Sequence, residues 1–267
     1  KNNLKKMIIT GGASTGKSVM AQTMALKYHN EGKKVLYLTP TRALTFQTNE
    51  NFILDGSLHK LNQFGNTNIN TVASALKAFY GAINLKKVIN NFKNDKWYSG
   101  NEKCDVLIID EIQDLLMTKP IDGIDYLTLF ENMVEGGFEN GIFIFCGDIV
   151  NQTLYRKKIL EENYNTLNND KSLSSEIIKN VLEDRIDPEE NIKLLKSIYN
   201  FQRFNLEINC RNPKKILEYL SEDSNTPLPR MRFKDDNSPD VERIKQSDGK
   251  KALISLCEKI KYLFEQN

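Results

Sequence analysis

Short apolar runs alternate along the chain with segments in which apolar residues recur every three or four positions. The runs that predict strands cover residues 7–9, 35–38, 68–72, 106–109 and 142–146. The segments that predict helices cover residues 18–29, 41–54 and 73–92. The runs at 106–109 and 142–146 are apolar throughout, as in strands that are buried on both faces, so we expect these two strands at the centre of the sheet. The pattern therefore predicts an α/β protein with a mostly parallel central sheet.

The character of the chain changes after about residue 152. Residues 155–203 are rich in Asn and charged residues, with a helix starting near Pro188, and we interpret them as a helical insertion or linker. We expect a first domain over residues 1–203, and the incomplete start of a second α/β domain over residues 204–267. The elements expected in this second part are strands at 204–208 and 240–245, helices at 213–220 and 250–264, and a long loop at 222–240.

Composition narrows the class without naming a function. Of 267 residues, 40% are hydrophobic and 27% are charged, which is typical of a globular protein and argues against wholesale disorder. The net charge of +2 lacks the basic excess of most nucleic-acid binders, although a local patch stays possible. No apolar run is long enough to span a membrane, so we expect a cytoplasmic protein with no membrane partner. With two His and four widely spaced Cys, we expect reduced thiols and no metal other than Mg²⁺.

A glycine-rich loop between the first predicted strand and the first predicted helix matches the pattern G-x-x-x-x-G-K-[ST]. Its residues are Gly11, Gly12, Ala13, Ser14, Thr15, Gly16, Lys17 and Ser18. Small residues let the backbone curl so that successive N–H groups point at phosphate oxygens. Lys17 would reach the β- and γ-phosphates, and the Ser18 hydroxyl would bind Mg²⁺. The loop therefore predicts ATP and Mg²⁺ as cofactors.

Two carboxylates follow the apolar run at 106–109. Asp110 and Glu111 stand at the carboxyl end of a predicted buried strand, where ligands bind in open α/β sheets. Asp110 suits the coordination shell of Mg²⁺, and Glu111 suits a general base that polarises the attacking water. A carboxylate in this second position favours hydrolysis over transfer of phosphate to a small acceptor, so a small-molecule kinase is disfavoured.

Residues 110–114 read Asp-Glu-Ile-Gln-Asp, which resembles motif II of superfamily 1 helicases of the UvrD/Rep type. Residues 35–44 resemble motif Ia, residues 145–155 motif III and residues 206–212 motif IV, in the family's order. The last two are similar to the helicase-like domains found beside nuclease-related domains and to Schlafen-like ATPases. The resemblance implies a RecA-like P-loop NTPase fold with the beginning of a second RecA-like domain.

The resemblance also implies roles for single residues. Gln152 matches the γ-phosphate sensor of motif III, and Arg211 matches the motif IV arginine that approaches the γ-phosphate across the cleft. A fixed positive charge there stabilises the transition state of phosphoryl transfer. From the residues alone, a helix cap is the alternative for Gln152, and a surface cation is the alternative for Arg211. Motif III carries one residue too many before Gln152, so Asn151 is an alternative sensor.

Motif Ia touches single-stranded nucleic acid in that family. The resemblance therefore implies strand contacts by Thr39, Thr41 and Arg42, whereas a solvated helix residue is the alternative for Arg42. We expect Phe46, four residues further on, to pack in the core and not to stack on a base.

The leading hypothesis is an ATP-hydrolysing motor domain of a superfamily 1 DNA helicase or translocase. The alternative is a P-loop ATPase that acts as a regulatory or defence switch without strand movement. The expected partners are single-stranded DNA or RNA, the remainder of a larger polypeptide with the second motor domain, and a nuclease domain. No match to motifs V and VI precedes residue 267, so we expect these residues alone to bind ATP and Mg²⁺ but to hydrolyse ATP weakly.

Overall fold

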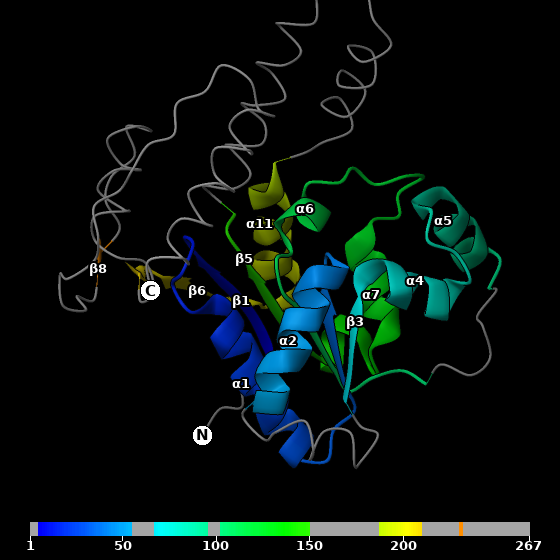
Figure 1. The fold of residues 1–267 in the computed structure, drawn as a ribbon. Coiled ribbons are helices and arrows are strands. Elements are labelled where there is room, and N and C mark those ends of the chain that lie inside the picture. Colours follow the sequence, from blue (N-terminus) through cyan, green and yellow to red (C-terminus); the bar gives the residue numbers. More distant parts are fainter. Residues whose placement is uncertain (1–4, 55–66, 96–101, 150–186, 210–229, 232–267) are drawn as a thin grey trace, which may run out of the picture. The chain divides into compact units, whose positions relative to one another are not determined.

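A computed structural model of the chain describes residues 5–54, 67–95, 102–149, 187–209 and 230–231. A parallel six-stranded sheet forms the centre, with the strand order β3-β2-β4-β5-β1-β6 (Figure 1). Its strands are β1 (Lys6–Gly11), β2 (Val35–Thr39), β3 (Thr67–Thr71), β4 (Val106–Ile109), β5 (Ile142–Gly147) and β6 (Gln202–Leu206). The predicted α/β class with a parallel central sheet is confirmed.

Helices cover both faces of the sheet. On one face lie α1 (Lys17–Asn30) and α2 (Arg42–Leu54), which Figure 1 draws in front of the strands. The helices that complete the described part are α4 (Val72–Tyr80), α5 (Leu85–Lys93), α6 (Gln113–Leu116), α7 (Tyr126–Met133), α8 (Gly137–Asn140) and α11 (Pro188–Tyr199). Two hydrophobic clusters result, one on each face, and every described helix contributes to one of them. No helix among these described residues is both long enough and apolar enough to cross a membrane.

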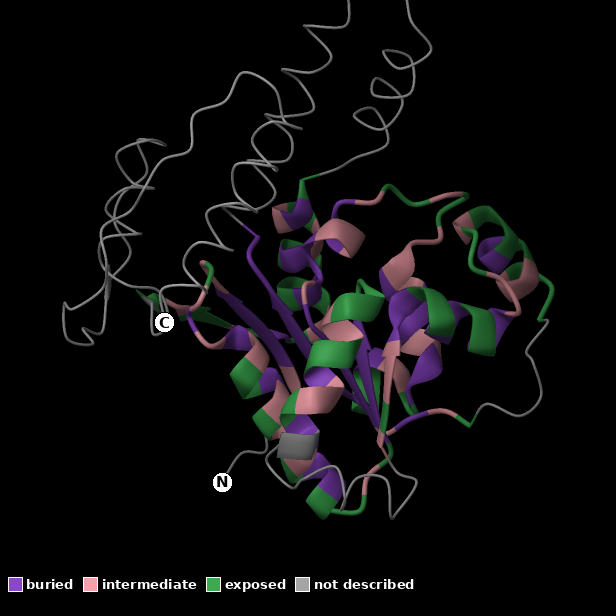
Figure 2. Ribbon diagram, viewed as in Figure 1, coloured by how far each residue is buried: buried purple, intermediate pink, exposed green. Residues whose placement is uncertain are grey.

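The centre of the sheet is dry because β4 and β5 carry apolar side chains on both faces. Every residue of these two strands is buried, as Figure 2 shows for the middle of the molecule. Alternate residues feed the two clusters, with Ile108 and Ile144 facing α1 and Leu107 and Phe143 facing the opposite helices. The continuous apolar runs therefore predicted the position of these strands in the sheet as well as their existence.

The single helix expected over residues 73–92 is wrong, because the segment holds two helices. Gly81 ends α4 in the left-handed conformation, with φ of 70°, and its N–H bonds to the Lys77 carbonyl. Asn84 then caps α5 through its side chain. Ile83, in the turn between the two helices, is 65% exposed, although a single helix over residues 73–92 would place it on the apolar face.

The expected domain boundary falls inside the sheet. Residues 202–206 form β6, which pairs in parallel with β1, so the strand predicted at 204–208 belongs to the first domain. The chain divides into two compact units, Lys1–Asn209 and Cys210–Asn267, and the structure describes only β8 (Arg230–Met231) of the second. A short strand β7 (Ile208–Asn209) ends the first unit. The later elements predicted between residues 210 and 267 lie outside the described residues.

Candidate nucleotide-binding site

The phosphate loop joins the carboxyl end of β1 to the amino end of α1, at one edge of the sheet. Gly16 precedes α1 in the left-handed conformation, with φ of 94°, which a residue with a Cβ adopts only at a cost. No side chain caps the helix and its first turn carries no acidic residue. The amide groups and the positive end of the helix dipole therefore remain available for an anion.

Lys17 is held inside this loop. Its side chain is only 6% exposed, and its Nζ donates hydrogen bonds to the carbonyl oxygens of Gly11 at 2.9 Å and Gly12 at 2.8 Å. Thr15 closes the loop from within, because its hydroxyl donates to the Gly12 carbonyl at 2.9 Å. A buried ammonium held by neutral carbonyls lacks a counter-charge among these contacts, so a phosphate oxygen would supply one.

Asp110 follows β4 at the same edge and is fully buried. Its Oδ2 accepts a hydrogen bond from the Tyr37 hydroxyl at 3.2 Å, whereas Oδ1 is buried without a hydrogen-bond partner among the described residues. Burial raises the pKa of Asp110 above its ordinary value, although the Ser18 hydroxyl beside it acts in the opposite direction. An unpartnered carboxylate oxygen beside a serine hydroxyl fits Mg²⁺, which prefers one or two carboxylates plus oxygens from phosphate and water.

Glu111 occupies an unusual backbone conformation. Its φ is 59°, in the left-handed region that costs a residue with a side chain about 1 kcal/mol or more. Its Oε2 accepts a hydrogen bond from Gln113 Nε2 at 2.6 Å. The strained turn and this bond fix the position of the glutamate next to Asp110, and such strain concentrates at functional sites.

The turn after β4 is tied to the end of β5. The Ile112 N–H donates to the Cys146 carbonyl at 2.9 Å. A Cβ on Gly147 would lie 2.6 Å from Gln113 Oε1, so only glycine leaves room for this buried glutamine. Asp148, the acidic residue of the motif III resemblance, follows directly and is 3% exposed. The segments that resemble motifs II and III are therefore neighbours in space.

A polar network on the other side of β1 was not expected from the sequence. Arg203 of β6 donates from Nε to the Thr10 hydroxyl at 3.2 Å, and its Nη1 pairs with Glu189 Oε2 of α11 at 2.8 Å. Thr10 precedes the phosphate loop, and a Cβ on Gly11 would lie 2.4 Å from the Leu206 carbonyl oxygen. Because residues 204–208 were assigned to another domain, nothing in the sequence pattern linked β6 to this loop.

The residues of the motif Ia resemblance separate into a buried and an exposed set. Thr39 is fully buried, and its hydroxyl donates to the Thr41 carbonyl at 3.1 Å and lies 2.6 Å from the Thr45 hydroxyl. Thr41 and Arg42 are exposed. Phe46 is 66% exposed, so the expectation that it packs in the core is wrong. Arg42 and Phe46 are four residues apart on α2 and so share a face of that helix.

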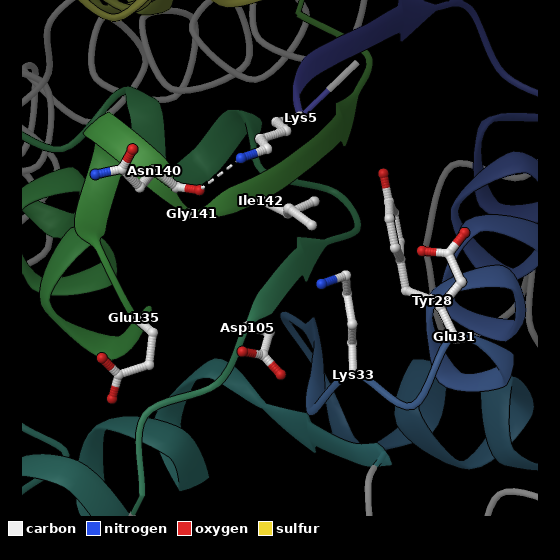
Figure 3. Close-up of a pocket in the computed structure, with 9 residues that line it drawn as sticks. All are labelled: Lys5, Tyr28, Glu31, Lys33, Asp105, Glu135, Asn140, Gly141 and Ile142. Carbon is white, nitrogen blue, oxygen red and sulfur yellow. Dashed lines mark hydrogen bonds between the residues drawn. The ribbon is translucent and has the colours of Figure 1, made fainter. Parts of the chain in front are cut away.

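A separate pocket lies at the opposite edge of the sheet, at the amino ends of the strands. It has a volume of about 180 Å³, and Figure 3 shows Lys5, Lys33, Asp105 and Glu135 around it, with Tyr28 on one side. Charges of both signs line this pocket, and Lys5 donates a long hydrogen bond of 3.5 Å to the Asn140 carbonyl. The pocket contains none of the residues that were predicted to bind nucleotide.

The remaining predicted site residues, Gln152 and Arg211, lie outside the described residues. The eight loop residues, Asp110 and Glu111 come together at one edge of the sheet. In the strand order, β5 separates β1, which carries the loop, from β4, which carries the acidic pair. The fold is that of a RecA-like P-loop NTPase.

Among solved structures, the chain is similar to the flagellar accessory protein FlaH from Methanocaldococcus jannaschii, with 24% identity and a TM-score of 0.34 over 53% of this chain and 60% of that one. A DNA replication initiation factor matches at 17% identity and a TM-score of 0.27, over 73% and 56% of the two chains. AMPPCP-bound DnaA from Aquifex aeolicus matches at 18% identity and a TM-score of 0.25, over 74% and 56%. The chain thus spans less than two thirds of each of these structures.

No curated protein matches the chain. The model of the DEAD/DEAH box helicase family matches residues 2–134, a stretch that includes the phosphate loop and the acidic pair after β4. This match supports a helicase ATPase core in the chain.

Proposed function

We propose that the chain is the ATP-binding and ATP-hydrolysing motor domain of a superfamily 1 DNA helicase or translocase, which moves on single-stranded nucleic acid. One observation carries the proposal. Lys17, buried in a phosphate loop, lies at the same sheet edge as the buried Asp110 and the strained Glu111. The superfamily 1 assignment rests on the Asp-Glu-Ile-Gln-Asp sequence at 110–114 and on the motif III and IV resemblances, whereas the matching family model is the DEAD/DEAH type.

The site has a place for each part of ATP and Mg²⁺. The amide groups of the loop and the start of α1 would bind the phosphates, with Lys17 neutralising the β- and γ-phosphates. The Ser18 hydroxyl and Asp110 Oδ1 would hold Mg²⁺, which neutralises developing charge on the phosphate oxygens when it is bound. Glu111 would take a proton from the attacking water, and Gln113 keeps its carboxylate in place through the 2.6 Å hydrogen bond.

The strand would pass over the start of α2. Arg42 offers a charge to a phosphate, and the exposed Phe46 offers a ring on which a base can stack. Thr39 is buried, so we assign it the role of holding the Thr41 backbone in place and not of touching the strand itself. Gln152 remains our proposed γ-phosphate sensor, and Arg211 our proposed arginine from the second motor domain, which would begin after Asn209.

The test is ATP hydrolysis by the full-length protein with and without single-stranded DNA. We expect DNA to raise the rate, and Phe46→Ala to remove most of this stimulation without changing the basal rate. Single-stranded RNA in a parallel assay distinguishes the two strand types. Hydrolysis that no strand affects would reject the motor and favour a regulatory or defence switch in the cytoplasm, whereas no nucleotide binding at all would reject both.

A further inference from the structure

We infer that Tyr37 is a positioning residue for Mg²⁺ binding, because its phenol holds one oxygen of Asp110 and leaves the other for the cation. This inference rests on the proposed nucleotide site. Tyr37 is fully buried, and its hydroxyl donates to Asp110 Oδ2 at 3.2 Å. Asp110 Oδ1 is buried without a hydrogen-bond partner among the described residues. The two oxygens of one carboxylate therefore differ in their surroundings.

The pairing of β2 with β4 produces this contact. Tyr37 lies opposite Ile108 in the parallel register, and Asp110 is two residues beyond Ile108, so both side chains emerge on the face that α1 covers. The Asp110 N–H donates to the Leu38 carbonyl at 2.9 Å, which extends the pairing to the end of the strand. The Tyr37 ring, which is part of the hydrophobic cluster under α1, can thus reach the Asp110 carboxylate. The phosphate loop lies at the same carboxyl edge of the sheet.

Packing fixes the direction of the phenol. The Tyr37 ring lies edge-on to Phe52 of α2, with centroids 6.5 Å apart and an interplanar angle of 86°. A ring confined in this way has little freedom to follow a rotating carboxylate, so the carboxylate adopts the orientation that the phenol selects. Without the hydroxyl, Asp110 Oδ2 would lose the hydrogen bond that holds it in a buried site, and the carboxylate could rotate away from Ser18.

Tyr37→Phe tests the inference, because it removes only the hydroxyl and keeps the ring. The measurement is the affinity of the chain for a fluorescent, slowly hydrolysed ATP analogue as Mg²⁺ is titrated, with an EDTA sample as the baseline. We expect the Mg²⁺ concentration for half-maximal binding to rise roughly tenfold, with unchanged binding in EDTA. In an Asp110→Asn background the same change should have no further effect, because Tyr37 acts through Asp110.

Tyr80→Phe is the matched control. The Tyr80 phenol is also fully buried, and it donates to the Leu129 carbonyl at 2.7 Å, a backbone acceptor that has no role in the proposed site. It should lower stability as Tyr37→Phe does and leave the Mg²⁺ titration unchanged. An unchanged titration in Tyr37→Phe, or the same shift in Tyr80→Phe, would overturn the inference while the proposed function stands. Wild-type binding that does not depend on Mg²⁺ would overturn both.

Discussion

Both edges of the sheet carry charged side chains, but the surroundings of these side chains differ. At the carboxyl edge, Lys17 and Asp110 are buried and each is held in a fixed orientation by neighbouring groups. At the amino edge, the pocket of Figure 3 is lined by Lys and acidic side chains, and Lys34 nearby pairs with Glu102 in solvent. Exposed ion pairs contribute little because water competes for both partners.

The backbone conformation contributes to the carboxyl-edge site as well as the burial of its charges. Gly16 and Glu111 at the carboxyl edge both have positive φ, and each precedes or follows an element that contributes to the site. Strained residues persist where the surrounding structure holds them in place. A phosphate-binding site is therefore recognised by charges that are buried and held in a fixed orientation, and the mere presence of charged residues at an edge does not identify it.

The largest expected effect is on ATP hydrolysis, when one lysine at each edge is replaced by alanine in separate variants. Lys17→Ala should lower the rate of ATP hydrolysis by at least about 10³-fold, because it removes a fixed positive charge from the γ-phosphate. Lys33→Ala, in the amino-edge pocket, should leave the rate within about twofold of the wild type. Steady-state hydrolysis by the full-length protein measures both. A comparable loss in the two variants would mean that the edges do not differ in function.

Replacing one glutamate at each edge separates an effect on the rate of hydrolysis from an effect on the affinity for ATP. Glu111→Gln keeps the hydrogen-bonding shape but not the base, so turnover should fall about 10²-fold or more while the affinity for ATP stays close to that of the wild type. Glu135→Gln at the other edge is the control and should change neither quantity. Single-turnover hydrolysis together with nucleotide binding resolves the two effects. Weakened binding in Glu111→Gln with unchanged turnover would exclude the role of general base.

The part of the site that could be predicted from the sequence is the part that short stretches of sequence encode. The phosphate loop and the acidic pair each lie within eight consecutive residues, directly after a strand, so local spacing sets their geometry. The Tyr37–Asp110 and Arg203–Thr10 hydrogen bonds join residues far apart in the chain. They depend on which strands are neighbours, and the apolar pattern does not encode strand order.

One signal could have revealed the Tyr37 contact. A tyrosine in a strand that is apolar on both sides must find a partner for its hydroxyl, because an unpaired buried hydroxyl is costly.

The two helices at 72–93 had signals of their own, a glycine that ends the first and an asparagine that starts the second. The helical spacing of apolar residues continues through both helices, so it did not reveal the turn between them. Phe46 was misjudged because apolar character alone does not distinguish a core side chain from an exposed one.

A smaller expected effect concerns stability, because the phosphate loop at the carboxyl edge packs closely against the backbone of β6. Gly11→Ala would place a Cβ 2.4 Å from the Leu206 carbonyl oxygen, so it should lower the free energy of unfolding by about 2–3 kcal/mol. Gly32, in the turn before β2, has φ of 76° and open space where a Cβ would stand. Gly32→Ala should therefore cost only the conformational strain, about 1 kcal/mol. Urea unfolding of both variants measures the gap, and equal losses would show that β6 does not press on the loop.

The smallest expected effect is a gain in folding stability when Asp110 is replaced, although the same replacement should impair Mg²⁺ binding. In the unfolded chain Asp110 has its ordinary pKa, whereas burial raises the pKa in the folded chain. The stability that this carboxyl contributes is therefore full below its ordinary pKa and is lost as the pH rises through the folded-state value. At neutral pH, without Mg²⁺ and nucleotide, Asp110→Asn should raise the free energy of unfolding by about 1 kcal/mol. This gain should shrink as the pH falls toward the ordinary pKa of aspartate, because Asn does not titrate.

Asp105→Asn at the amino edge is the control and should give no such gain, since Asp105 is partly exposed and accepts the Lys34 N–H at 2.8 Å. Urea unfolding of the two variants across this pH range measures the difference. If Asp110 is arranged to bind a cation, removing its negative charge in the absence of that cation should raise the free energy of unfolding. A lower free energy of unfolding for Asp110→Asn at neutral pH would show that Asp110 stabilises the fold instead.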